Sequence, residues 1–78
     1  MTRYVVTVRI TVGEQQIRHW LTFDPYIGPH FTPDGNEAAE VQSRAKAVGW
    51  KTWVTLNRPH LKPRLSRRMA SGEKENDE

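Results

Sequence analysis

The stretch that most constrains the fold is Arg3–Val12, with the sequence RYVVTVRITV. It is rich in β-branched residues and alternates in polarity, which is typical of a β-strand with one buried face. Successive side chains of a strand point to opposite faces, so the apolar residues collect on one of them. The opposite face carries Arg3, Val5, Thr7, Arg9 and Thr11. We expect this second face to meet water or a partner.

A second strand follows the first almost at once. A Gly-Glu pair can form a two-residue turn, in which glycine supplies the positive φ. Residues 15–23, QQIRHWLTF, then place Ile17 opposite Ile10 on the apolar face. A four-residue loop would shift the partners but keep the faces. The tighter turn puts Arg9 directly opposite Arg18, which is unfavourable unless an anion lies between them.

Three prolines interrupt the chain between residues 24 and 33, DPYIGPHFTP. Because proline has no backbone N–H, we expect a stiff loop and not a regular central strand or helix. Two arrangements of its aromatic side chains are open. They either pack over the edge of the core or form an exposed contact surface.

A helix is predicted over residues 34–48. Asp34 and Glu37 can form a capping box at its start, and Asn36 is the alternative cap. Gly49 can end the helix. The apolar residues in between are small and recur at helical spacing, so the helix is expected to pack closely on the sheet.

Residues 50–56, WKTWVTL, are predicted to form a third strand. Because it follows a crossover helix, it would run parallel to the second strand and antiparallel to the first. The first strand then lies in the middle of a three-stranded antiparallel sheet with the order 2-1-3. The predicted fold class is α+β: a small ββαβ domain over residues 1–57 with one helix packed on one face.

The charge is unevenly distributed along the 78 residues, whose net charge is +3. Residues 1–56 carry six basic and five acidic side chains, residues 57–72 carry five basic and no acidic ones, and residues 73–78 carry one basic and four acidic ones. We therefore expect a basic tail over residues 58–70, with a short helix as one option, and an acidic, disordered tip over residues 71–78.

The composition also indicates the environment of the protein. The chain contains no cysteine, so neither a disulfide nor a thiolate metal site can form and a reducing, cytoplasmic location is expected. The sequence has no apolar run near the roughly 18 residues of a membrane-spanning helix. No cofactor, membrane or small-molecule substrate is expected.

The sheet face that the helix leaves uncovered is the predicted binding site. Cations beside flat aromatic rings suit nucleic acid, because phosphates meet the cations and bases stack on the rings. The same residue types are enriched in protein–protein hot spots, and the tail could also fold back over this face. The candidates are Arg9, Arg18, Trp20, Lys51 and Trp53 on the sheet, Arg58, Lys62, Arg64, Arg67 and Arg68 in the tail, and Tyr26, His30 and Phe31 in the loop.

These residues predict a non-enzymatic module that binds nucleic acid or a nucleoprotein. The alternative is a small inhibitor or adaptor that binds a nucleic-acid-handling protein complex, and a dimer formed through the open face is a further option. A ribonuclease built on His30, His60 and Arg58 is a weaker hypothesis, because the sequence carries no catalytic or metal-binding motif. We expect replacement of Arg18 or Trp20 to reduce binding while leaving the fold nearly intact.

Two layouts resemble known groups of proteins. The order hairpin, helix, strand and basic tail over residues 3–62 resembles that of several very small phage-encoded proteins that disable a host machine, among them polymerase inhibitors and some anti-CRISPR proteins. The stretch RHWLTF followed by EAAEVQSRAKAVGW resembles the sheet-plus-helix DNA-binding domains of integrases and AP2-type factors. Those domains place three strands before the helix, where this sequence predicts two.

Overall fold

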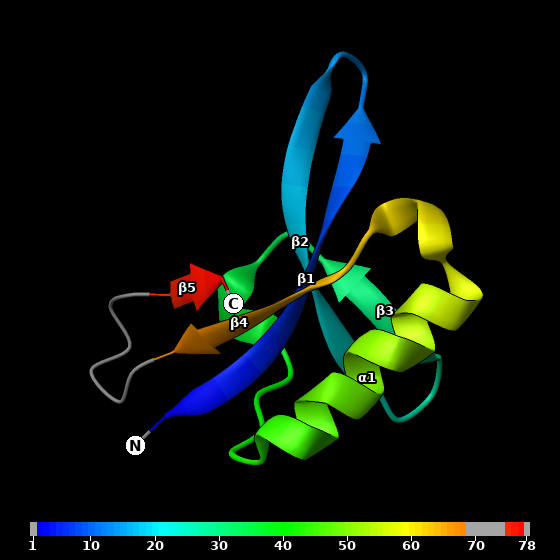
Figure 1. Cartoon of the computed structure of the whole chain (residues 1–78). Coiled ribbons are helices and arrows are strands. Elements are labelled where there is room, and N and C mark those ends of the chain that lie inside the picture. Colours follow the sequence, from blue (N-terminus) through cyan, green and yellow to red (C-terminus); the bar gives the residue numbers. More distant parts are fainter. Residues whose placement is uncertain (1, 69–74, 78) are drawn as a thin grey trace.

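The computed structural model describes residues 2–68 and 75–77. In these ranges the chain forms β1 (Arg3–Val12), β2 (Gln15–Asp24), β3 (Gly28–Thr32), the 3-10 turn η1 (Gly35–Glu37), α1 (Arg44–Asn57), the 3-10 turn η2 (Pro59–Leu61), β4 (Arg64–Arg68) and β5 (Glu75–Asp77), as Figure 1 shows. The strands make one antiparallel sheet in the order β3-β2-β1-β4-β5. The predicted α+β class is confirmed. The sheet has five strands and not three, so the ββαβ order is wrong.

The hairpin of β1 and β2 forms as predicted. Gly13 takes a positive φ of 63° in the two-residue turn between the strands. Ile10 pairs with Ile17, and Arg9 pairs with Arg18. The tip of the hairpin stands clear of the other elements in Figure 1. Local alternation and one turn glycine therefore determine this unit.

The proline-rich segment contains a strand that was not predicted. β3 pairs with β2 at the edge of the sheet, with Pro29 opposite Phe23. An edge strand tolerates proline because only one of its sides needs backbone hydrogen bonds. In the turn before β3, the Asp24 carboxylate accepts hydrogen bonds from the backbone N–H groups of Tyr26 (2.7 Å) and Ile27 (3.1 Å), which lower the pKa of Asp24. Three strands therefore precede α1, where the sequence predicted two.

The helix lies further along the chain than predicted. α1 includes residues 50–56, so the strand predicted there is wrong, and the helix predicted over 34–48 is confirmed only for residues 44–48. Its start is set by Ser43, whose Oγ accepts a hydrogen bond from the backbone N–H of Lys46 at 3.2 Å. Gly49, expected to end the helix, lies inside it. A serine cap nine residues after Asp34 thus replaces the predicted start.

The segment before this cap is largely extended. The Asp34 side chain caps only η1, by accepting a hydrogen bond from the backbone N–H of Asn36 at 2.9 Å. Val41 then exchanges two backbone hydrogen bonds with Tyr4, of 2.7 and 3.0 Å. These bonds satisfy the backbone without a helix.

The place predicted for residues 50–56 beside β1 is taken by the tail. β4 pairs with β1 from Arg3 opposite Arg68 to Thr7 opposite Arg64, and β5 pairs with β4. Residues 64–68 of the tail therefore form a strand and not the short helix that was considered, and Glu75–Asp77 of the acidic tip are a strand as well. Residues 69–70 of the tail lie outside the described residues. The expectation of disorder for residues 71–74 and 78 lies outside the described residues.

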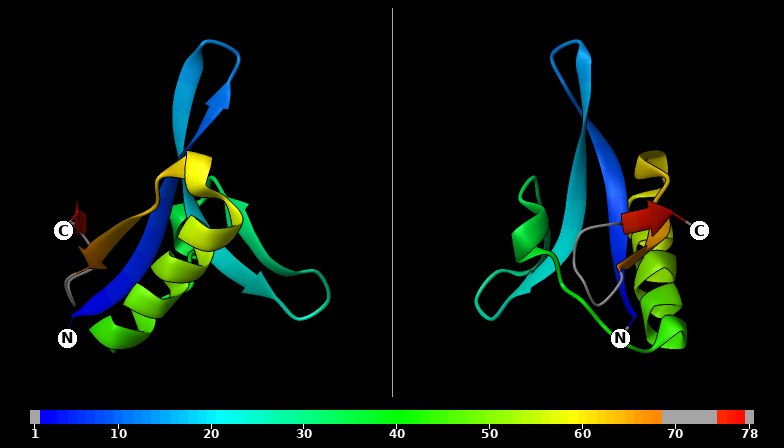
Figure 2. Two further views of the ribbon diagram at one scale, coloured as in Figure 1. Left: turned by 45° about the vertical axis from the view of Figure 1, so that its right-hand side comes forward. Right: turned by 90° about the vertical axis from the view of Figure 1, so that its left-hand side faces the viewer.

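Both faces of the sheet are covered, as in the alternative in which part of the chain folds over the second face. Figure 2 shows α1 on one face and η1 on the other. The residues of the core on the α1 side are Val6, Val8, Leu21, Ala47, Val54 and Leu65. On the η1 side Val5 and Ser66 are fully buried, and Thr7 is 4% exposed. The prediction of an open second face is therefore wrong for its central part.

Candidate functional site

The η1 side of the sheet gathers five of the predicted site residues. Alternation along the strands and the pairs Arg9–Arg18, Thr7–Arg64 and Arg3–Arg68 put their side chains on one face. The predicted residues that share this face are Arg9, Arg18, Trp20, Arg64 and Arg68. Arg64 and Arg68 come from the tail, so β4 brings the two predicted groups together.

Three other predicted residues lie elsewhere. Lys51 and Trp53 belong to α1, so their assignment to the sheet is wrong. Arg67 is opposite Tyr4, which packs against the core on the α1 side. These residues do not share a surface with Arg9 and Arg18.

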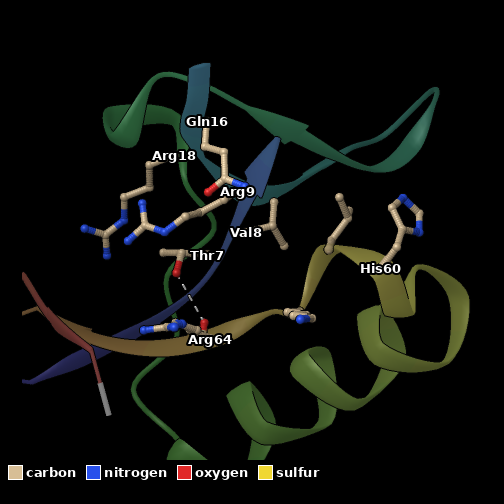
Figure 3. A pocket seen from close by; sticks show the side chains of 9 residues that line it. Thr7, Val8, Arg9, Gln16, Arg18, His60 and Arg64 are labelled. Carbon is tan, nitrogen blue, oxygen red and sulfur yellow. Dashed lines mark hydrogen bonds between the residues drawn. The ribbon is translucent and has the colours of Figure 1, made fainter. Parts of the chain in front are cut away.

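A pocket of about 360 Å³ opens at the boundary of this face, and we call it the basic pocket. Its lining residues are Thr7, Val8, Arg9, Gln16, Arg18, His60, Leu61, Lys62 and Arg64. It lies where the pairing of β1 with β4 ends at Thr7 and Arg64, next to Lys62, which connects η2 to β4 and has a φ of 49°. Figure 3 shows Arg9 and Arg18 on one flank and His60, from η2, on the other.

The charge of the basic pocket is one-sided. Four guanidinium or ammonium groups line it, and the described residues contribute no carboxylate to the lining. Within residues 2–68 and 75–77 the Arg9 side chain has no hydrogen-bond or ion-pair partner. Arg9 also faces the like charge of Arg18 across the strand pair. An anion bound between them would relieve this repulsion.

Two carboxylates of β5 neutralise the part of the face beside the pocket. Arg18 Nη2 lies 2.6 Å from Glu75 Oε1 and 2.9 Å from Asp77 Oδ1. Glu75 also accepts hydrogen bonds from Trp20 Nε1 at 3.0 Å and from Arg68 Nε at 2.7 Å. The sequence prediction missed both acids. Glu75 and Asp77 are two residues apart, so in a strand both side chains lie on one face, and this spacing was the signal in the sequence that could have identified them.

The ion pairs continue across the face as an alternating series. Asp77 lies 3.9 Å from Arg64, and Glu40 lies 3.2 Å from both Arg3 and Arg68. Together with the pairs of Arg18, four arginines alternate with three acids from one edge of the face to the other. Such a network fixes several long side chains at once.

Trp20 is enclosed by this network. The guanidinium carbons of Arg18 and Arg68 lie 5.4 and 6.0 Å from the centre of its ring. Gly35 of η1 packs on the ring, and a Cβ there would come within 3.2 Å of Trp20 Cζ2. The Gly35 carbonyl accepts a hydrogen bond from Arg68 at 2.8 Å. Trp20 is thus half-buried and not a free stacking surface.

A second surface lies between β3 and α1. A groove of about 180 Å³ is lined by Leu21, Phe23, Pro29, Trp50 and Trp53. The rings of Phe23 and Trp50 are 5.1 Å apart, and Trp53 is 43% exposed. Beyond the groove, Trp53 also lines a hollow of about 300 Å³ whose other lining residues are Pro29, His30, Phe31, Asn57 and Arg58.

The aromatic residues of the proline-rich segment divide between core and surface. Phe31 packs against the core, whereas Tyr26 is 94% exposed and Ile27 is 72% exposed at the turn before β3. The sequence left open whether these side chains pack over the core or form an exposed contact surface, and the structure shows the first for Phe31 and the second for Tyr26.

The histidines lie in separate hollows. His60 lines the basic pocket, and His30 lines the hollow beside Trp53. Among the described residues there is no group of three or more His, Cys, Asp or Glu side chains that could hold a metal ion. No helix in that part of the chain is long and apolar enough to span a membrane.

The chain was compared with protein-family models, curated proteins and solved structures. No family model, curated protein or solved structure matches it.

Proposed function

We propose that the protein is a non-enzymatic module that binds nucleic acid through phosphate contacts in the basic pocket. The observation that carries this proposal is the opposed Arg9–Arg18 pair in a pocket with four cations. Guanidinium groups present planar pairs of donors that match phosphate oxygens. A phosphate between Arg9 and Arg18 would replace their repulsion with two charge-assisted contacts.

The arrangement favours contacts to the nucleic-acid backbone over contacts to bases. Trp20 is enclosed by Glu75 and Gly35, and Trp53 lies on α1. The stacking surface expected from the sequence is therefore not available beside the basic pocket. Backbone contacts position a nucleic acid without reading its sequence, so binding should depend weakly on sequence and strongly on salt.

Fluorescence anisotropy with labelled mixed-sequence DNA at several salt concentrations tests the proposal. Arg9→Gln should weaken binding to all sequences and reduce the slope of log affinity against log salt by about 0.7–0.9, because one phosphate contact is lost. The matched control is Lys46→Gln, which removes one exposed positive charge from α1, away from the pocket. Absence of binding at low salt, or equal effects of the two variants, contradicts the proposal.

A second candidate function is the binding of a protein surface by the groove between β3 and α1, as in an inhibitor or adaptor. The observation in its favour is the exposure of Trp53 in the groove and of Tyr26 at the turn before β3, since aromatic residues are common anchors in interfaces. The partner would supply an apolar segment that fills the groove. A partner retained from nuclease-treated lysate by the wild-type chain, and lost with Trp53→Ala but not with Arg9→Gln, supports this function. Loss of all partners on nuclease treatment contradicts it.

A further inference from the structure

The acidic strand β5 forms ion pairs with cations that line the basic pocket. Asp77 Oδ1 lies 2.9 Å from Arg18, and Asp77 Oδ2 lies 3.9 Å from Arg64. Both arginines line the pocket. Any polyanion that enters the pocket therefore meets a carboxylate that already binds two of its four cations.

Glu75 sits in a set of donors that would also suit a phosphate. Its carboxylate receives hydrogen bonds from Arg18 Nη2 at 2.6 Å, Arg68 Nε at 2.7 Å and Trp20 Nε1 at 3.0 Å. These donors converge on oxygen atoms with negative charge and do not distinguish a carboxylate from a phosphate. The Glu75 side chain is only 15% exposed, so the site is shaped around it.

β5 is also the element of the described sheet that should detach most easily. It has three residues, lies at the edge of the sheet and pairs with β4 alone. Short edge strands with few apolar contacts open at low cost compared with core strands. Besides its backbone pairing with β4, β5 is held mainly by ion pairs with arginines, and a ligand with several negative charges can compete for these pairs.

From these observations we infer that β5 is an internal competitor, which a nucleic acid displaces when it binds. This inference rests on the proposed function and extends it to the regulation of the same site. Departure of β5 removes both carboxylates from Arg18 and one of the two from Arg68, and it leaves the Trp20 Nε1 donor without its acceptor Glu75. The basic pocket then continues along the sheet into a site that offers the Arg18 cation and the Trp20 indole N–H as donors to a phosphate of a single strand.

An NMR titration of the full-length chain with short mixed-sequence single-stranded DNA at low salt tests the inference. The reporters are the indole N–H of Trp20, assigned with Trp20→Phe, and the backbone amides of Glu75–Asp77. We expect the Trp20 indole signal and these amides to shift together as DNA binds. The indole signals of Trp50 and Trp53 serve as internal controls, because they lie on α1.

The matching affinity measurement compares Asp77→Asn with Glu14→Gln. Both variants raise the net charge by one, but only Asp77 contacts pocket arginines, and Glu14 lies in the turn of the β1–β2 hairpin. We expect Asp77→Asn to bind DNA about two- to fivefold more tightly than Glu14→Gln, as the loss of its partly exposed ion pairs with Arg18 and Arg64 implies.

The outcomes separate the inference from the function on which it rests. DNA binding without a shift of the Trp20 indole, or equal affinities of the two variants, overturns the inference and leaves the proposed function intact. If the wild type and both variants fail to bind at low salt, the proposed function is wrong and the inference falls with it.

Discussion

The two faces of the sheet are closed by different forces. On the α1 side, Leu21 and Val54 are at most 1% exposed and pack among other apolar side chains. On the η1 side, Trp20 and Arg18 are held by Glu75, whose strand is distant in sequence. The first face depends on apolar burial. On the second face Val5 is also buried, but the contacts around Trp20 are mainly charged hydrogen bonds.

This difference indicates which face is suited to change. Apolar burial stabilises by about 25 cal/mol per Å² and is little affected by dilute salt. Partly exposed ion pairs contribute about 0–1 kcal/mol each and weaken as salt screens them. The α1 side therefore provides most of the stability. We therefore expect the η1 side to tolerate the exchange of one set of negative charges for another without loss of the fold.

The largest effect is expected from Leu21→Ala on the α1 side. Leu21 is 1% exposed, and its truncation leaves a cavity that should lower the free energy of unfolding by about 2–5 kcal/mol. Urea denaturation measures this loss, which should be nearly the same at low and high salt. If Leu21→Ala lowers the free energy of unfolding by less than Trp20→Ala does, the η1 side and not the α1 side provides more of the stability.

Trp20→Ala should have an intermediate effect. The sequence led us to expect little change in stability, but the ring packs on Gly35 and its Nε1 donates to Glu75. Because Trp20 remains partly exposed, we expect a loss of about 1–3 kcal/mol in the free energy of unfolding. Trp53→Ala, at a residue that is 43% exposed, is the control and should cost less. An unchanged unfolding midpoint for Trp20→Ala would mean that the η1 side is open.

A smaller loss is expected from Glu75→Gln. This change preserves the shape of the side chain but removes the charge that Arg18 and Arg68 share. We expect a loss of about 1 kcal/mol at low salt, with less at high salt, because the pairs are partly exposed. Denaturation at two salt concentrations measures it. A loss that does not depend on salt would show that Glu75 acts through packing.

The smallest effect is a gain in stability from Gly49→Ala. Gly49 lies inside α1, and a Cβ there would meet no atom within 4 Å. Alanine should therefore stabilise the helix by about 0.5–1 kcal/mol. Gly13→Ala is the control, because the φ of 63° at Gly13 strains any other residue. A loss of stability for Gly49→Ala would support the predicted helix end at this position.

Local sequence determined the hairpin and part of the site. Alternating residues with a glycine turn admit one good register, and that register alone placed Arg9 opposite Arg18 with Trp20 on the same face. Apolar content could not separate a helix from a strand over residues 50–56, because short apolar runs suit both. Lys51 and Trp53 were misplaced for this reason.

The remaining strands were decided by contacts between distant residues. β4 fills the place beside β1 because Leu65 reaches the core while Arg64 and Arg68 stay on the η1 side. Edge strands of three to five residues are too short to show a clear alternation of apolar and polar residues. Their pairing depends on a neighbouring strand that has already formed.

By itself, the sequence determined that this chain has a central hairpin and a basic face, because both follow from residues close together in the chain. Only the tertiary structure decided that Glu75 and Asp77 cover part of that face. Charge composition shows how many acids are present but not where they fold. Attraction between opposite charges acts once β4 has brought Arg68 beside Arg3 and given β5 an edge on which to pair.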